Sequence, residues 1–211
     1  GAAQEILGER GIAELVGEAA ARDADPAEER ALLLRVARHA AGPLADLPRA
    51  ARIYEDLRLR EPADREVWEP LADVYRRLGD GARLAALIED TVPLIDSPEE
   101  RGRLRLERAR LVLSQDETRA IPLLQEVLEE TPSQAEAASL LAGVFERQGM
   151  LDDLASLLRR QIDTAKDRED ARAVTDLSMK LGALLERRGD EEGALEAAAR
   201  VAEAVGALAR V

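Results

Sequence analysis

A seventy-residue internal repeat constrains the fold of this chain more than any other feature. The segment GDGARLAALIED at 79–90 returns as GMLDDLASLLRR at 149–160, and the same offset relates Trp68 to Ala138 and Pro62 to Pro132. A half-period with steps of 35, 34, 36, 34 and 40 residues links Leu15, Ala50, Leu84, Ala120, Leu154 and Ala194. Such a period is typical of arrays that stack one small structural unit on the next.

The repeating unit is predicted to be a pair of α-helices. Ala, Leu, Glu and Arg are abundant and aromatic residues make up 2% of the chain, so helix is favoured throughout and strands are not. Apolar residues recur at steps of three and four, as in Val67, Leu71, Val74 and Leu78, which is the stripe of an amphipathic helix. Helix-ending and helix-starting residues separate these stripes at Gly79, Gly149, Gly189, Pro26, Pro62, Pro98 and Pro132.

The sequence resembles the tetratricopeptide repeat (TPR) family, whose pattern runs Trp-x2-Leu-Gly-x2-Tyr, Ala-x3-Phe and Pro. The residues that carry this resemblance are Trp68, Leu71, Ala72, Tyr75 and Gly79, then Ala50, Tyr54 and Pro62, then Ala120, Leu124 and Pro132, and Leu181, Gly182, Leu185, Gly189 and Ala194. The resemblance implies an all-α fold, a right-handed α-α superhelix of about six helix-turn-helix units and roughly twelve helices. It covers almost the whole chain.

We expect one array over residues 1–211, with units at about 1–24, 25–62, 63–97, 98–132, 133–165 and 166–206. Small residues in both helices of a pair are expected to let the helices approach closely. The stretch around Lys166 carries about six residues more than the family's 34-residue repeat, so the helices beside it should be longer. Pro70 and Pro93 are expected to kink or end their helices. The ends have no polar cap, so we expect the chain to be part of a longer protein.

Composition narrows the classes of function. The chain has no cysteine, so disulfide frameworks and cysteine nucleophiles are excluded and a cytoplasmic location is expected. A net charge of −13 disfavours nucleic acid and anionic lipid, and no apolar run reaches the roughly 18 residues of a membrane span. Arg far outnumbers Lys and Ala is abundant, which is typical of GC-rich bacterial coding.

The sequence predicts no catalytic site, no metal site and no cofactor. His39 is the single histidine, so histidine-based triads and multi-histidine metal sites are excluded, and a solvent-facing or helix-end position is expected for it. Asp152 and Asp153 are interpreted as charges that favour a helix start rather than as ligands of a metal. No glycine-rich phosphate loop is present in the sequence.

A partner protein or peptide is therefore expected to bind the surface of the array. Family resemblance implies groove positions on the first helix of each unit: Glu66, Glu69, Asp73, Arg76 and Arg77, then Glu136, Ser139, Glu146 and Arg147, then Asp176, Met179, Glu186 and Arg187. Arg101, Arg105 and Arg108 form a stripe that could hold an acidic peptide, or a face neutralised by carboxylates. Acidic Glu69 and Asp73 argue against a clamp for chaperone C-termini.

Three functions remain open at this point. The first is an interaction scaffold that binds its partner through the concave face without catalysis. The second is a spacer or self-association element of a larger protein, which meets another copy through its apolar end VAEAVGALARV. The third is an all-helical enzyme that uses carboxylates and a metal, with Asp152 and Asp153 as its first candidates.

Overall fold

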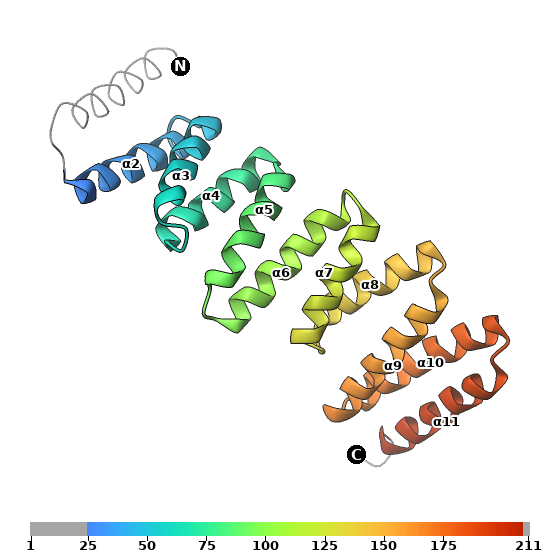
Figure 1. Cartoon of the computed structure of the whole chain (residues 1–211). Coiled ribbons are helices and arrows are strands. Elements are labelled where there is room, and N and C mark those ends of the chain that lie inside the picture. Colours follow the sequence, from blue (N-terminus) through green and yellow to red (C-terminus); the bar gives the residue numbers. More distant parts are fainter. Residues whose placement is uncertain (1–24, 209–211) are drawn as a thin grey trace. The chain divides into compact units, whose positions relative to one another are not determined.

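The computed structural model describes residues 25–208, and every regular element in that range is helical (Figure 1). This confirms the all-α prediction. The described range holds ten α-helices rather than the twelve predicted for the whole chain, and the first predicted unit, residues 1–24, lies outside the described residues. The helices are α2 (Pro26–Ala41), α3 (Leu47–Arg60), α4 (Arg65–Leu78), α5 (Gly81–Thr91), α6 (Pro98–Leu113), α7 (Glu117–Glu130), α8 (Ala135–Gln148), α9 (Leu151–Asp167), α10 (Ala171–Arg188) and α11 (Glu191–Leu208), with a 3-10 helix η1 (Val92–Leu94).

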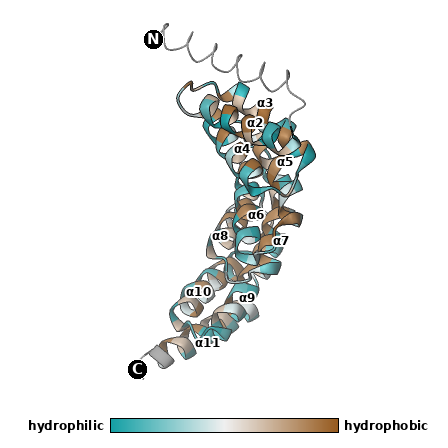
Figure 2. Cartoon of the chain, turned by 90° about the vertical axis from the view of Figure 1, so that its left-hand side faces the viewer, coloured by the Kyte–Doolittle hydropathy of each residue, from teal (hydrophilic) through white to brown (hydrophobic). Residues whose placement is uncertain are grey.

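The chain divides into two compact units, residues 1–111 and 112–211. Within each unit, sequence neighbours pack against one another: α2 on α3, α3 on α4 and α4 on α5 in the first, and α7 on α8, α8 on α9, α9 on α10 and α10 on α11 in the second. Hydrophobic and hydrophilic residues alternate along the helices (Figure 2). Each helix therefore buries one stripe of its surface against its neighbours.

Left-handed glycines and aspartate caps set the helix boundaries. Gly79, Gly149 and Gly189 end α4, α8 and α10 with φ between 68° and 74°, a conformation that costs an L-residue energy but not glycine. Aspartate side chains accept a hydrogen bond from the first-turn backbone of seven of the described helices, at Asp25, Asp46, Asp64, Asp80, Asp116, Asp170 and Asp190. These local signals confirm the turns predicted at Gly79, Gly149 and Gly189.

Replacing Gly149 by alanine is expected to lower the free energy of unfolding by about 1 kcal/mol, because an added Cβ strains the left-handed backbone. No atom lies within 4 Å of that Cβ, so the strain is the whole cost. Gly182→Ala is the matched control, since its Cβ would meet Ala197 at an ordinary 3.5 Å and its φ is not positive. Urea unfolding followed by circular dichroism should show Gly182→Ala to be neutral or slightly stabilising. Equal losses for the two variants would contradict the cap argument.

The prolines behave differently from one another. Helix α5 ends at Thr91 and Pro93 lies in the short 3-10 helix that follows, so the expected helix end is confirmed there. Pro70 lies inside α4, and this helix continues to Leu78. A proline removes one backbone hydrogen bond, but Val67, Leu71 and Val74 are buried around Pro70, and we attribute the continuity of α4 to this packing. Pro122 lies inside α7 in the same way.

The extra residues near Lys166 lengthen both neighbouring helices, as predicted. Helix α9 has 17 residues and α10 has 18, against 14 in α8. The last helix pair also departs from the predicted register, because Ala194 is only half-buried while Ala197 is fully buried and faces Gly182. Small residues still sit at the α10–α11 contact, one helical turn later than the repeat predicts.

Charged and hydroxyl groups tie the helices of the first unit together beyond its apolar core. The Arg58 guanidinium on α3 reaches α5, where it donates to Thr91 Oγ1 at 3.1 Å and lies 3.6 Å from Asp90. The Tyr75 hydroxyl donates to Glu55 Oε1 at 2.6 Å, joining α4 to α3. Burial and this hydrogen bond raise the pKa of Tyr75, so the phenol stays protonated. These contacts therefore join consecutive helices, α3 and α4, and also α3 and α5, which are separated by one helix in the sequence.

Candidate functional site

A groove of about 1030 Å³ runs across the second unit and is lined by α8, α9 and α10. We call it the second-unit groove. Its apolar lining comes from leucines of α9 and α10: the half-buried Leu151 and Leu177, and the buried Leu154, Leu157, Leu158 and Leu184, which form its floor. Its polar lining includes Ser139, Gln161 and Thr164. An apolar surface with a few polar groups is the usual composition of a binding site.

Small side chains on α8 create the room for this groove. The lining residues of α8 are Ala135, Ala138, Ser139, Ala142, Gly143 and Glu146. Seventy residues earlier, the equivalent face of α4 carries Arg65, Trp68, Glu69, Ala72, Asp73 and Arg76. Four of these positions carry a larger residue in α4 and Ala, Ser or Gly in α8, which leaves more room along α8.

In the first unit, the equivalent face is occupied by the chain's own side chains. Arg65 lies 2.9 Å from Glu100 and Arg76 lies 2.7 Å from Glu107, so α4 is bridged to α6 at two places. The Arg65 guanidinium also stacks over the Trp68 ring at 5.8 Å. The groove described above lies along the corresponding face of the second unit.

The charges of the groove are balanced, although the chain as a whole has a net charge of −13. The six charged residues that line it are Glu146, Arg168, Asp170, Asp176, Lys180 and Arg187. Asp170 caps α10 by accepting from the backbone of Ala173 at 3.0 Å. Within residues 25–208, the other five side chains form no ion pair with a neighbour, so their charges are available to a ligand.

The structure brings together several residues that sequence analysis placed in a groove. Ser139, Glu146, Asp176 and Arg187 all line the second-unit groove, from two different helices. Three others on the same helices do not line it: Arg147, which lies 2.6 Å from Glu117, Met179, which is 61% exposed, and Glu136. Glu186 is exposed outside it as well.

The predicted residues of α4 are engaged within the first unit. Glu69 lies 3.1 Å from Arg65, and Asp73 lies 3.7 Å from Arg77. Arg77 also donates to the carbonyl of Ala41 at 2.8 Å, and Glu66 lies 3.4 Å from Arg30. A partner that bound this face would first have to displace these contacts.

The arginine stripe of α6 is largely paired with groups of the same unit. Arg101 donates to the carbonyls of Ile95 and Asp96 at 2.7 and 2.8 Å, which holds the turn before α6. Arg108 lies 2.7 Å from Glu89 on α5, and Arg105 also has a partner. The geometry favours the neutralised face, while the role of this stripe in binding stays a prediction.

Lys180, Arg168 and the leucines of the groove were not among the residues predicted from the sequence. That prediction covered only the groove positions that the TPR pattern implies, and none of these residues occupies one. A signal was available in the seventy-residue alignment, where Trp68 is replaced by Ala138. A large residue that becomes small at an equivalent position indicates vacated space.

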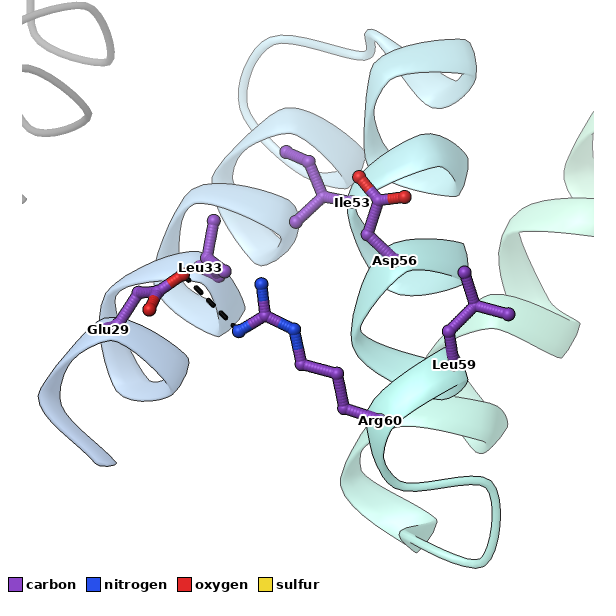
Figure 3. A pocket seen from close by; sticks show the side chains of 6 residues that line it. All are labelled: Glu29, Leu33, Ile53, Asp56, Leu59 and Arg60. Atoms are coloured by element: carbon purple, nitrogen blue, oxygen red, sulfur yellow. Dashed lines mark hydrogen bonds and ion pairs between the residues drawn. The ribbon is translucent and has the colours of Figure 1, made fainter. Parts of the chain in front are cut away.

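A second, smaller pocket of about 390 Å³ lies on α2 and α3 (Figure 3). Leu33 and Ile53 line it, and Glu29 meets Arg60 across it at 3.3 Å. The Leu59 side chain, 83% exposed, stands at its edge. Two of its three charged residues, Glu29 and Arg60, are paired with each other, and its volume is less than half that of the second-unit groove.

The residues considered for catalysis do not line the groove. Asp152 and Asp153 occupy the first turn of α9, and Asp152 forms an ion pair with Arg188. His39 is exposed in the last turn of α2, as predicted. In the described part of the chain, no group of three or more acidic or histidine side chains could hold a metal ion.

None of the helices in the described range combines the length and the apolar character needed to cross a membrane.

No protein-family model matches the chain, and no curated protein is similar to it in sequence. Similar solved structures include MamA, at 19% identity and a TM-score of 0.47, with 85% of this chain and 93% of that chain covered. They also include YrrB, described as a TPR protein with an unusual peptide-binding site, at 18% identity and 0.45, covering 82% and 84%. A putative kinesin light chain of Podospora anserina with TPR-like repeats has 17% identity and 0.46, covering 89% and 99%.

Two of these three structures are described by their TPR or TPR-like repeats, the family that the sequence resembles. At TM-scores below 0.5, the description of the chain as a TPR-like helical repeat protein rests on its own helix pairs and on their glycine and proline boundaries.

Proposed function

We propose that the protein is a non-catalytic interaction scaffold that binds a peptide or a domain of another protein in the second-unit groove. We further propose that its predicted units form one right-handed superhelical array in the cytoplasm, with this groove on the concave face. The partner would place apolar side chains against the leucines of the groove and polar groups near Glu146, Lys180 and Arg187.

The observation that carries this proposal is the open groove itself. The first unit fills the equivalent face with Trp68 and two ion pairs, whereas the second unit leaves about 1030 Å³ unfilled along α8. Monomeric proteins keep few large apolar concavities, and those they keep are commonly binding sites. Charged side chains that lack partners within the described residues supply the polar contacts for specificity.

Filling the groove tests the proposal. Ser139→Arg places a long cationic side chain in the groove and is expected to weaken partner binding at least tenfold. Ser156→Arg on the exposed face of α9 is the matched control, because it adds the same charge outside the groove. A displayed peptide library selected on the wild-type protein supplies the ligand, and fluorescence anisotropy measures the affinity of each variant. Equal affinities for both variants, or a library that yields no ligand, would contradict the proposal.

Self-association is a second candidate function that one observation favours. The last described helix, α11, exposes Leu195 and Val205 on its outer surface. A scaffold whose terminal helix presents apolar side chains has a surface for a further protein chain.

A further inference from the structure

Helix α11 has an apolar outer face that no other described helix covers. Leu195 is 74% and Val205 49% exposed. Exposed alanines lie between them at helical spacing, at Ala198, Ala199 and Ala202. The opposite side of the helix is buried against α10 through Ala197 and Ala204. The outer face is thus an apolar stripe about 15 Å long, at 1.5 Å per residue.

One edge of this stripe is acidic. Glu192, Glu196 and Glu203 are exposed and fall on the same side of the helix, at steps of four and seven residues. Arg200 lies 3.4 Å from Glu196, and within the described residues no cation pairs with Glu192 or Glu203. The other edge carries alanine and valine. Glu191 stands at the N-terminal end of the apolar stripe itself, and beyond it the carboxylates of the outer surface follow this one edge.

The second-unit groove is complementary to this surface. Its α8 wall is made of small residues, which let an alanine-rich helix edge approach closely. Its α10 wall carries Lys180 and Arg187, seven residues apart. Glu196 and Glu203 are also seven residues apart, so both pairs are spaced by about 10.5 Å along their helices.

The groove also holds Glu146 and Asp176, so it is not uniformly basic. The chain as a whole has a net charge of −13 and repels an acidic helix edge. The groove has equal numbers of positive and negative side chains, so its repulsion of such an edge is weaker.

We propose that α11 of a second copy of this chain lies in the second-unit groove of the first. In this arrangement, Leu195 and Val205 pack on the groove leucines, and Glu196 and Glu203 face Lys180 and Arg187. The inference rests on the proposed function, since it names the partner of the same groove. The contact is heterologous, because it joins two different surfaces, so each added copy leaves one groove and one helix free for the next.

Sedimentation velocity of the whole chain between about 5 and 500 µM tests this contact. The mass is expected to rise from 23.0 kDa with concentration and to pass that of a dimer. Leu195→Glu should keep the chain monomeric over this range, and so should Lys180→Glu with Arg187→Glu. Leu59→Glu is the matched control, an 83% exposed leucine of the first unit that receives the same charge, and it should assemble like wild type. A monomeric wild type, or a monomeric Leu59→Glu variant, overturns the proposal.

Mixing the two assembly-deficient variants separates this contact from a symmetric one. The Leu195→Glu chain keeps its groove and the Lys180→Glu, Arg187→Glu chain keeps its helix, so the mixture should form a one-to-one complex and stop there. Adding Glu196→Lys and Glu203→Lys to the Lys180→Glu, Arg187→Glu chain should restore assembly by reversing both charges. Self-assembly of the groove variant alone, or no complex in the mixture, overturns the proposal.

The failure of this inference differs from the failure of the proposed function. A wild-type chain that stays monomeric but binds library peptides, with Ser139→Arg blocking them, leaves the groove as a site for another protein and removes the second copy as its occupant. If the wild-type chain neither binds library peptides nor self-associates, both the proposed function and the proposed contact between copies are contradicted.

Discussion

Truncating Phe145 to alanine is expected to lower the free energy of unfolding by about 3–5 kcal/mol, one of the two largest effects predicted for this chain. Phe145 on α8 is 2% exposed and is one of the largest fully buried side chains. Its removal takes away the transfer free energy of the ring and leaves a cavity among packed helices. Because neighbouring helices hold each other in an array, the loss should spread along the second unit. Urea unfolding followed by circular dichroism measures it.

The control for this prediction is Phe145→Tyr. The residue seventy positions earlier is Tyr75, whose hydroxyl donates to Glu55, and Gln125 lies seventy positions after Glu55. If the two positions are equivalent, the Gln125 amide oxygen accepts from a tyrosine hydroxyl at 145, and we expect a change of less than about 1 kcal/mol. If Phe145→Tyr were as destabilising as Phe145→Ala, the structural equivalence of the two positions would be contradicted.

Enlarging Ala120 to leucine is the second prediction with a large effect, an expected loss of about 1–3 kcal/mol. Ala120 on α7 has no exposed surface, and three added carbon atoms must displace the packed side chains around it. The prediction is informative because leucine is the natural residue at the equivalent positions of the half-period, Leu84 and Leu154, both of which are buried. Thermal and urea unfolding of the variant measure the change.

Ala86→Leu is the matched control, because Ala86 is exposed on α5 and the same side chain is added there. Its effect should stay within about 0.5 kcal/mol. If Ala120→Leu left the free energy of unfolding unchanged, the position of Ala120 would have as much room for a side chain as those of Leu84 and Leu154. The packing would then repeat every thirty-five residues. The expected loss instead supports alternation with a period of seventy.

Local signals in the sequence were enough to predict much of the fold. Glycine is needed at positions 79, 149 and 189 because the backbone there is left-handed, and this requirement depends only on adjacent residues. The lengthening of α9 and α10 followed from a count of residues between landmarks. The predictions of helix boundaries and helix lengths were confirmed because a few neighbouring residues determine where a helix begins and ends.

Predictions that depended on packing held less well. The register of the last helix pair is shifted by one turn, from Ala194 to Ala197, and α4 does not end at Pro70, where a kink stays a prediction. In each case, contacts with residues distant in sequence outweigh a local preference worth a few kcal/mol at most.

The sequence by itself determined where the helices begin and end and that they repeat in pairs, because backbone preferences and apolar stripes are properties of short segments. Only the tertiary structure decided which of the predicted surface residues share a site. Ser139 and Arg187 line the same groove because α8 and α10 both pack on α9, whereas Arg76 is held by Glu107. Whether a charged side chain is free or paired depends on which helices lie next to it, and that is set by packing between segments far apart in the chain.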